Sequence, residues 1–222
     1  NHQATSVKTV HRIALFDAKG DVTSVISQSD VVRFLLAHVD ELGDAADASV
    51  AQLGLVGGPV VAVDAHCPTL MAYAALAERH LSGGPVLAPD ETLLANLSVS
   101  DLRALTAEHL SVLALPVAEF LAVQHNTSYL GYSVHASGAK GHAFFGAPRH
   151  APDSALGLKE KREDVRTFTV TSKTLLRELL HAFVNNHVHR VYVVDDAQGQ
   201  KVKAVISLTD VLRLVVGEPG KE

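Results

Sequence analysis

The sequence contains no tryptophan, a single cysteine and a single methionine, and only 5% of its residues are aromatic. One cysteine forms no intramolecular disulfide and no cysteine-based zinc site. A reducing compartment is the simplest context for such a chain, so we expect a cytoplasmic protein. No apolar run approaches the roughly 18 residues that a membrane helix needs, and no secretory signal is evident in a sequence that begins at Asn1.

The chain also lacks an excess of positive charge and the common catalytic signatures. Its net charge of -5 argues against a nucleic-acid binder that relies on phosphate contacts. No G-x-S-x-G, H-E-x-x-H or P-loop pattern occurs, and the 13 histidines follow no metal-ligand spacing. We therefore expect neither an enzyme nor a metal site. A hydrophobic content of 47% in 222 residues is ample for one large domain or two small ones.

What the sequence does contain is one motif in three places. Ser-x-[Ser/Thr]-Asp lies each time between an apolar, strand-like run and an apolar, helix-like run: Val25–Val31 (VISQSDV), Asn96–Leu102 (NLSVSDL) and Val205–Val211 (VISLTDV). Internal repeats of this kind determine the architecture before any single residue does. We call them the first, middle and last Ser–Asp motifs, each belonging to one copy of a repeated unit.

The last copy is the clearest, and its pattern predicts the order β-α-β-β-α. The alternating and apolar runs predict a strand, a helix that Ser172 can cap, a buried strand, a turn, a strand and a closing helix, over Val165–Thr171, Thr174–His187, Arg190–Val194, Asp195–Gln200, Lys203–Ile206 and from Ser207 onwards.

The other two copies follow the same order. For the middle copy we expect strands and helices over Pro59–Val63, Leu70–Leu81, Val86–Ala88, Leu93–Leu97 and Leu102–Leu105. The first copy has only the back half, with strands over His11–Asp17 and Val22–Ile26 and a closing helix. About ten residues precede this half, which are too few for the missing strand and helix.

Two connectors separate the copies. Short helical turns are expected at Ser49–Leu53 and Leu115–Leu121. The stretch from His125 to Arg166 is rich in Gly, Ala, Ser, Pro and His without a clear period, which is typical of a long and partly mobile loop.

These residues resemble the cystathionine-β-synthase-type (CBS) domain, whose hallmarks match His189–Asp195 and Ala204–Leu212. The set of copies is similar to the γ subunit of AMP-activated protein kinase and its SNF4-type relatives, the plant ones above all. The resemblance implies an α/β (α+β) fold of tandem CBS domains paired into Bateman-type modules. We expect the middle copy to pair with the last, and the first copy to pair with one outside the chain. The expected ranges are an incomplete copy (residues 1–40), a connector (41–58), a copy (59–110), a connector with the long loop (111–166) and a copy (167–217).

The repeated motif supports two interpretations. Ser-x-x-Asp is a capping box in form, and capping boxes begin many helices that bind nothing. The same geometry suits a nucleotide, because a helix N-terminus attracts phosphate and a carboxylate there can accept hydrogen bonds from ribose hydroxyls. A cationic side chain placed to bind the phosphate would distinguish the nucleotide interpretation from the structural one.

The resemblance assigns roles to particular residues. It implies ribose binding by Asp210, Asp101 and Asp30, and contacts near phosphate for Ser207, Thr209, Ser98 and Ser27, with His189–Arg190 and His11–Arg12 as the phosphate cations. Gly83-Gly84-Pro85 stands where the middle copy should have this pair, so that site is empty, binds adenosine alone or borrows Arg190. We expect Asp210 to bind first and Asp30 second. Val170, Thr171, Val61 and Ala62 are adenine-pocket candidates by family position, with ordinary core as the competing interpretation.

Two functions follow from these interpretations. The first is a non-catalytic energy sensor that binds AMP, ADP or ATP between CBS copies and acts on a protein kinase of the SNF1 or AMP-activated type. The alternative is an interaction scaffold with degenerate nucleotide sites, which serves a kinase complex or a larger assembly. A third function, an enzyme with a CBS regulatory module, needs a catalytic domain for which these 222 residues leave no room, so it requires a larger protein than this sequence.

Overall fold

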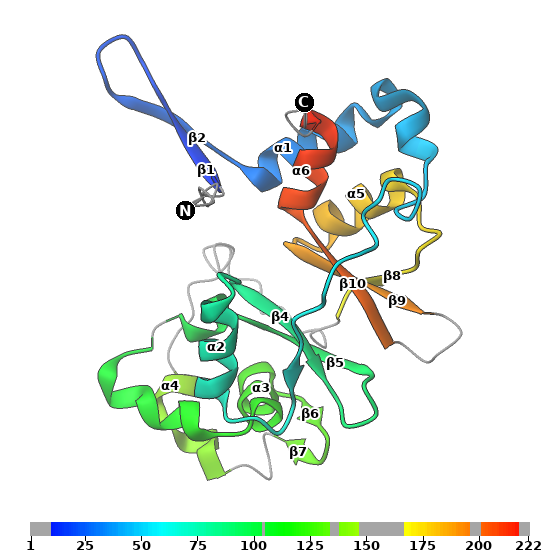
Figure 1. The fold of residues 1–222 in the computed structure, drawn as a ribbon. Helices are drawn as coiled ribbons and strands as arrows, with labels where there is room; N and C mark the ends of the chain where they lie inside the picture. The colour runs from blue at the N-terminus through cyan, green and yellow to red at the C-terminus, as the bar shows by residue number, and fades with distance from the viewer. Residues whose placement is uncertain (1–9, 104, 134–137, 147–166, 196–200, 218–222) are drawn as a thin grey trace, which may run out of the picture. The chain divides into compact units, whose positions relative to one another are not determined.

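A computed structural model describes residues 10–103, 105–133, 138–146, 167–195 and 201–217. By their contacts the residues form two compact units. Unit 1 comprises residues 1–58, 168–194 and 203–222, and unit 2 comprises residues 59–167 and 195–202. Both units contain helices and strands, so the predicted mixed α/β class is confirmed (Figure 1). In the described part of the chain, no helix combines the length and the apolarity needed to cross a membrane.

Unit 1 combines the first copy with most of the last. Its elements are β1 (Arg12–Phe16), β2 (Val22–Ser27), α1 (Gln28–Ala37), η1 (Val39–Asp47), β8 (Thr169–Val170), α5 (Leu176–Asn185), β9 (Arg190–Asp195), β10 (Lys201–Ser207) and α6 (Leu208–Val216). Strands β1 and β2 form an antiparallel hairpin, and the second sheet has the order β10-β9-β8 with β8 parallel to β9.

The core of unit 1 lies between three helices and one sheet. On α5 the apolar side chains recur at helical spacing, so a single face is buried, with Leu176, Leu179 and Leu180 each at most 1% exposed. Helix α1 adds Val32, and α6 adds Val211, to the same cluster. Burying one such side chain contributes about 1.5–3 kcal/mol, so these few residues hold α1, α5 and α6 together.

The contact of α1 with α5 and α6 was not expected from the sequence, which assigns the partner of the first copy to a copy outside the chain. Instead, Val32 and Leu35 of α1 share the core cluster of the last copy. A hydrogen bond of 3.2 Å from the Gln28 side chain to the Thr209 hydroxyl joins the first turns of α1 and α6. The pairing of the middle copy with the last copy stays a prediction.

Unit 2 contains the middle copy and the second connector. Its elements are β3 (Val63–Asp64), α2 (Thr69–Glu78), β4 (Gly83–Leu87), β5 (Leu93–Ser98), η2 (Val99–Leu102), η3 (Ala107–Ala114), α3 (Val117–His125), β6 (Ser128–Tyr129), β7 (Tyr132–Ser133), η4 (Gly138–Gly141) and α4 (Ala143–Gly146). The main sheet has the order β3-β4-β5 with β3 parallel to β4.

Most predicted elements are present with shifted ends. The helices predicted over 174–187 and 70–81 are the shorter α5 and α2. The strand predicted over 59–63 shrinks to β3 and the described part of the strand predicted over 165–171 shrinks to β8, because only two residues of each pair with a neighbour. Residues 165 and 166 lie outside the described residues. Ser172 does not cap α5, whose N-cap is Leu175. The predicted turn at Asp195–Gln200 lies outside the described residues except for Asp195.

The predicted closing helix of the middle copy, Leu102–Leu105, is wrong. The chain instead makes the single turn η2 and leaves it at Arg103. In a continued helix the carbonyl of Asp101 would accept the amide of Leu105. Here the Gln124 side chain donates to that carbonyl, and the Leu105 amide donates to Leu102. A side chain from α3 has thus replaced the helical hydrogen bond.

The prediction of a single long loop after His125 is also incomplete. The described part of this stretch contains the small hairpin β6–β7 and the turns η4 and α4. Phe144 of α4 is 1% exposed and stacks on Phe120 of α3 at 6.0 Å between ring centroids. Local periodicity could not reveal this segment, since its few apolar residues pack on a distant helix rather than on one another.

Gly84 of β4 lies close to the main chain just before β3 in unit 2. A Cβ atom added there would lie 2.9 Å from the Val61 carbonyl oxygen and 3.3 Å from Leu76 Cδ2. The first contact is with main chain, so the strand itself must move to accommodate a side chain. The equivalent positions in the other copies, Ile13 and Val191, carry large side chains, which shows that the middle copy is packed more tightly here.

We predict that Gly84→Ala lowers the free energy of unfolding by about 1–3 kcal/mol, the usual cost of overpacking. Gly57→Ala is the matched control, because nothing lies within 4 Å of its added Cβ, and it should change stability by less than about 0.5 kcal/mol. Urea unfolding of the three proteins measures both values. Equal stability of the Gly84 variant and the parent would contradict the close packing of β4.

Candidate functional site

Each Ser–Asp motif forms the same cap at the end of a strand. In the first motif, Asp30 Oδ2 accepts hydrogen bonds from the Ser27 amide at 2.9 Å and the Ser27 hydroxyl at 2.7 Å, and the Ser27 hydroxyl accepts the Asp30 amide. These bonds lower the pKa of Asp30, the hydroxyl having the largest effect, followed by the Ser27 amide and Arg33. The aspartate therefore stays ionised beside the N-terminus of α1.

The last motif repeats this arrangement. Asp210 Oδ2 accepts from the Ser207 amide at 2.8 Å and from its hydroxyl at 2.6 Å. In the middle motif Asp101 Oδ2 accepts the Ser98 amide at 2.8 Å, while the Ser98 hydroxyl donates to the Ser82 carbonyl. The capping interpretation of the motif thus holds in all three copies, and one oxygen of each carboxylate is used for it.

The second oxygen of the carboxylate distinguishes the three copies. Asp30 Oδ1 lies 2.8 Å from an Arg33 nitrogen, in an ion pair whose side chains are 44% and 59% exposed. Asp101 Oδ1 lies 4.0 Å from His125 Nε2, and both side chains are largely buried. Asp210 borders an open hollow of about 350 Å³, together with Leu53, Leu55, Arg213, Leu214 and Gly217. We call this the Asp210 hollow.

The middle motif is enclosed by its own unit. Tyr73 donates its hydroxyl to the Ser98 carbonyl at 2.8 Å, and burial together with the nearby Asp101 carboxylate raises the pKa of Tyr73. His125 approaches Asp101 from the end of α3, and Gln124 donates to the Asp101 carbonyl. Protein groups therefore already surround Asp101, one of the three aspartates that the sequence predicts to bind ribose.

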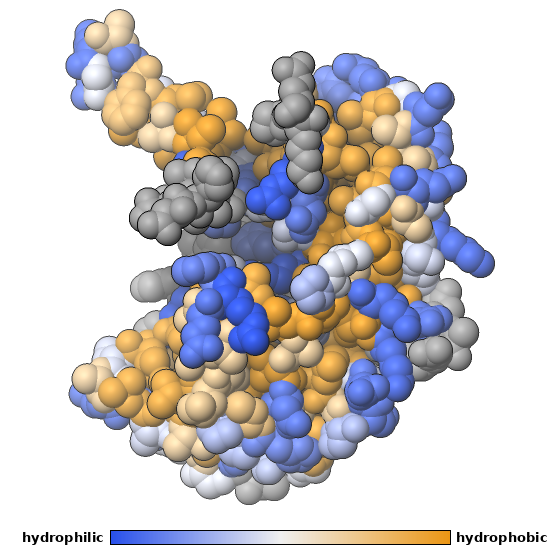
Figure 2. Space-filling view, in the orientation of Figure 1, coloured by the Kyte–Doolittle hydropathy of each residue, from blue (hydrophilic) through white to orange (hydrophobic). Residues whose placement is uncertain are grey.

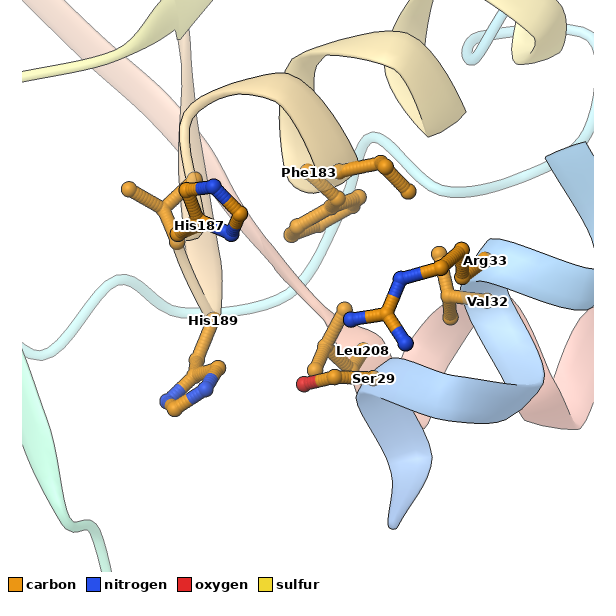
Figure 3. A pocket seen from close by; sticks show the side chains of 9 residues that line it. Ser29, Val32, Arg33, Phe183, His187, His189 and Leu208 are labelled. Carbon is orange, nitrogen blue, oxygen red and sulfur yellow. The ribbon is translucent and has the colours of Figure 1, made fainter. Parts of the chain in front are cut away.

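A second hollow, of about 200 Å³, lies where α1, α6 and the α5–β9 turn meet. Its lining residues are Ser29, Val32, Arg33, Phe183, Val184, His187, Val188, His189 and Leu208. Figure 3 shows Arg33 facing His187 and His189 across this space, with Ser29 and Leu208 at its lower side. Three cationic or potentially cationic side chains and the first turns of two helices converge here, so we call it the cationic pocket.

The predicted His–Arg pairs lie beside the motifs. The carbonyls of His11 and His189 accept the first helical amides of α1 and α6, at 3.1 and 3.4 Å. In the middle copy the Ser82 carbonyl accepts the Val99 amide in the same way, and Gly83 pairs with Ser98 as Arg12 pairs with Ser27. The middle copy therefore has Ser82–Gly83 at the His–Arg position.

The structure does not bring the predicted site residues into one pocket. His189 lines the cationic pocket and Asp210 lines the other hollow, whereas His11 and Arg12 are exposed on the β1–β2 hairpin. Arg190 begins β9 and is half-buried. None of the four adenine-pocket candidates lines either hollow: Val170 and Val61 pack against the cores of their units, Thr171 is half-buried and Ala62 is exposed.

Several lining residues were missed by the sequence analysis. Arg33 and Arg213 each follow a motif aspartate by three residues, so a repeated Asp-x-x-Arg pattern could have revealed both. His187 lies just after α5 and two residues before the predicted His189, so the His-x-His pattern is a second usable signal. Leu53 and Leu55 carry no pattern that links them to a motif 150 residues away. Within the described residues, no group of three or more His, Cys, Asp or Glu side chains is placed to hold a metal.

Residues 163–217 match the family model of the CBS domain, which corresponds to the last copy. Among solved structures, the fold is similar to a Methanocaldococcus jannaschii protein proposed as an archaeal homologue of γ-AMPK, with a TM-score of 0.57 and 15% identity over 93% of this chain and 59% of that one. A conserved protein from Pyrococcus horikoshii has the same TM-score and identity, over 92% and 69%. The CBS domain of a bacterial CNNM/CorC-family Mg2+ transporter has a TM-score of 0.50 and 16% identity, over 88% and 99%.

A search of curated protein sequences finds no match. Residues 163–217 thus match the CBS domain, and the fold of the chain is similar to that of a solved CBS-domain structure, as the sequence predicts. The chain spans 59% of the length of the protein proposed as an archaeal γ-AMPK homologue. At these identities the likeness concerns the fold alone.

We predict that the cap of α1 loses its electrostatic contribution in acid. Because the folded-state pKa of Asp30 is lowered, ionised Asp30 stabilises the fold above its unfolded pKa of about 3.9, and this contribution disappears as the pH falls through the lower folded value. The stability difference between the parent and Asp30→Asn should therefore be present at about pH 7 and vanish well below about pH 4.

Denaturant unfolding at a series of pH values measures this difference. Asp44→Asn, at an exposed position of η1, is the control for a general loss of negative charge. A difference for Asp30→Asn that stays constant down to about pH 2 would show that the carboxylate does not act through its charge.

Proposed function

We propose that this chain is a non-catalytic regulatory module that binds an adenine nucleotide, AMP, ADP or ATP, in unit 1. The observation that carries the proposal is the convergence of the first turns of α1 and α6 with Arg33, His187 and His189 around one pocket. A helix N-terminus carries a partial positive charge, which favours a phosphate. Two helix N-termini beside the Arg33 guanidinium and the His187 and His189 imidazoles form surroundings suited to a phosphate. A motif that served only as a helix cap would not need them.

The ribose is assigned to the free oxygen of a motif aspartate. Asp210 is the first choice, because Oδ2 is used in the cap and the side chain borders a hollow. Leu53, Leu55 and Leu214 offer apolar walls for the adenine in that hollow, in place of the four residues that the sequence suggests. Leu208 borders one hollow and Asp210 the other, so both hollows lie against the first turn of α6.

Asp30 is the second choice for the ribose. Its Oδ1 is held by Arg33, in an exposed ion pair that is worth little in water. A phosphate in the cationic pocket would compete with Asp30 for Arg33 and so free this oxygen. Asp101 is the last choice, since His125 and Tyr73 surround its motif.

The partner that responds to nucleotide binding is proposed to be a protein kinase of the SNF1 or AMP-activated type, as for the SNF4-like proteins that the sequence resembles. The support is this resemblance, together with the fold shared with a protein proposed as an archaeal γ-AMPK homologue. Regulation requires unequal nucleotide affinity for two arrangements of the copies, so that binding shifts their populations. A chain of this kind makes and breaks no bonds.

An interaction scaffold is the competing function, and two observations favour it. All three motif aspartates act as helix caps, and the middle motif is closed by groups of its own unit. A scaffold needs the caps but no ligand. Binding measurements separate the two functions.

We predict that at least one of AMP, ADP and ATP raises the melting temperature of the chain. A ligand that binds only the folded state, at about 100 times its Kd, stabilises it by about 2.7 kcal/mol, which corresponds to a shift of about 5–10 °C in a protein of this size. Adenosine, S-adenosylmethionine and NADH complete the panel, and adenosine reports how much the phosphate contributes. No shift with any of the six at millimolar concentration favours the scaffold.

We predict that Asp210→Asn weakens nucleotide binding at least about tenfold, since it keeps an amide oxygen for the cap but removes the charged acceptor for the ribose. Asp210→Ala should lose the same affinity and also some helix stability. Asp101→Asn is the matched control, because its motif is enclosed, and it should leave the affinity unchanged. Isothermal titration at a single pH measures all three. Unchanged affinity in Asp210→Asn would refute the ribose assignment.

A further inference from the structure

Within the described residues of unit 1, neither face of the β1–β2 hairpin is covered. Its large apolar side chains are strongly exposed: Ile13 is 58%, Leu15 41% and Ile26 37% exposed on one face, and Phe16, Val22 and Val25 are 63%, 58% and 53% exposed on the other. Figure 2 shows hydrophobic side chains along the hairpin and hydrophilic ones at its tip. A two-stranded hairpin is marginally stable at best in water, so we expect a partner to cover this surface.

The other two copies show what covers such a hairpin. In the last copy the residues equivalent to Ile13, Leu15 and Ile26 are Val191, Val193 and Ile206, which are at most 1% exposed and share a cluster with Leu179, Leu180 and Phe183 of α5. In the middle copy Val86 and Leu97 take two of these places, are 0% exposed and share a cluster with Leu76 of α2. The covering element is in both cases an amphipathic helix.

In the other two copies, a short parallel strand pairs with the edge that corresponds to β1. β3 adds in parallel to β4, with Val63 opposite Val86, and β8 adds in parallel to β9, with Val170 opposite Val193. Val86 and Val193 both correspond to Leu15, since Gly83 and Arg12 hold the same register position and Arg190 matches Arg12 in sequence. In the described residues β1 has β2 as its one neighbour, so its other edge is open.

We propose that the β1–β2 hairpin is the docking surface for a strand–helix segment of protein of the same design as β3–α2 and β8–α5. Its apolar strand pairs in parallel with β1 around Ala14–Phe16, and its amphipathic helix covers Ile13, Leu15 and Ile26. A second copy of this chain does not fit as well, because its two described strand–helix segments already cover their own hairpins and two β1 edges related by a twofold axis would pair antiparallel. The inference concerns a surface separate from both hollows and does not depend on the nucleotide.

The probe for the experiment is a synthetic peptide of residues 167–187, which carries the sequence of β8 and α5. It is added at up to about 1 mM to the intact chain, a concentration that allows for the cost of ordering a free peptide. Hydrogen exchange of the chain is followed by mass spectrometry, and the affinity is measured from the anisotropy of labelled peptide. We expect slower exchange in β1 on addition of peptide, because a paired and covered strand opens less often.

Two matched double variants test which face is used. Ile13→Thr/Ile26→Thr alters the cross-strand pair on the face assigned to the helix, and Val22→Thr/Val25→Thr alters the opposite face. All four positions keep a β-branched residue and lie outside both core clusters, so folding should survive. The first variant should bind the peptide at least about tenfold more weakly than the parent, and the second should bind within about twofold of it.

Several results would overturn the proposal. One is the absence of protection in β1 at about 1 mM peptide, and another is equal weakening by the two double variants. Protection of β9 without β1 would mean that the peptide only exchanges with the chain's own β8–α5. A dimer in sedimentation that dissociates in Ile13→Thr/Ile26→Thr would make a second copy the occupant instead.

Discussion

The double hydrogen bond from one serine to the aspartate three residues later is the constraint on which unit 1 depends. It stops β2 at Ser27 and β10 at Ser207 and begins a helix at the next residue. Because strand and helix are joined without a linker, the first turn of each helix has a fixed place at the end of its hairpin. Gln28 and Thr209 then link the two first turns, and the space beside them becomes the cationic pocket.

The same constraint explains why a structural and a functional interpretation of the motif coexist. Capping uses Oδ2 of the carboxylate, and the other surroundings of the carboxylate differ from copy to copy. Oδ1 lies beside a guanidinium at Asp30 and an imidazole at Asp101, whereas the Asp210 side chain borders an open hollow. The motif therefore specifies the geometry of the helix start, while residues from other elements decide whether a ligand can reach it. One repeated motif can in this way support both an enclosed and an accessible site.

The sequence predicted the repeats, the order of elements and the fold class, because these follow from local patterns: alternation in strands, helical spacing on α5 and Ser-x-x-Asp caps. It did not predict the contact of α1 with α5, since packing between segments over 130 residues apart leaves no periodic trace. The closing helix of the middle copy was wrong for a related reason, because the side chain of Gln124 competes for the Asp101 carbonyl. In the site, His189 and Asp210 followed from the motifs. Leu53 and Leu55 instead reach the Asp210 hollow through a turn that is held by the Val50 amide, which donates to the Thr174 carbonyl.

The direct passage from β2 into α1 has a mechanical consequence. Ser27 ends the hairpin, Gln28 begins the helix, and Ser29 and Arg33, one turn further on, line the cationic pocket. The Ser27–Asp30 cap thus joins the hairpin directly to the first turns of α1, which form part of the pocket wall. Coupling between the hairpin and the pocket would require two positions of α1 with unequal affinities for their ligands, and its magnitude would then be the same in both directions.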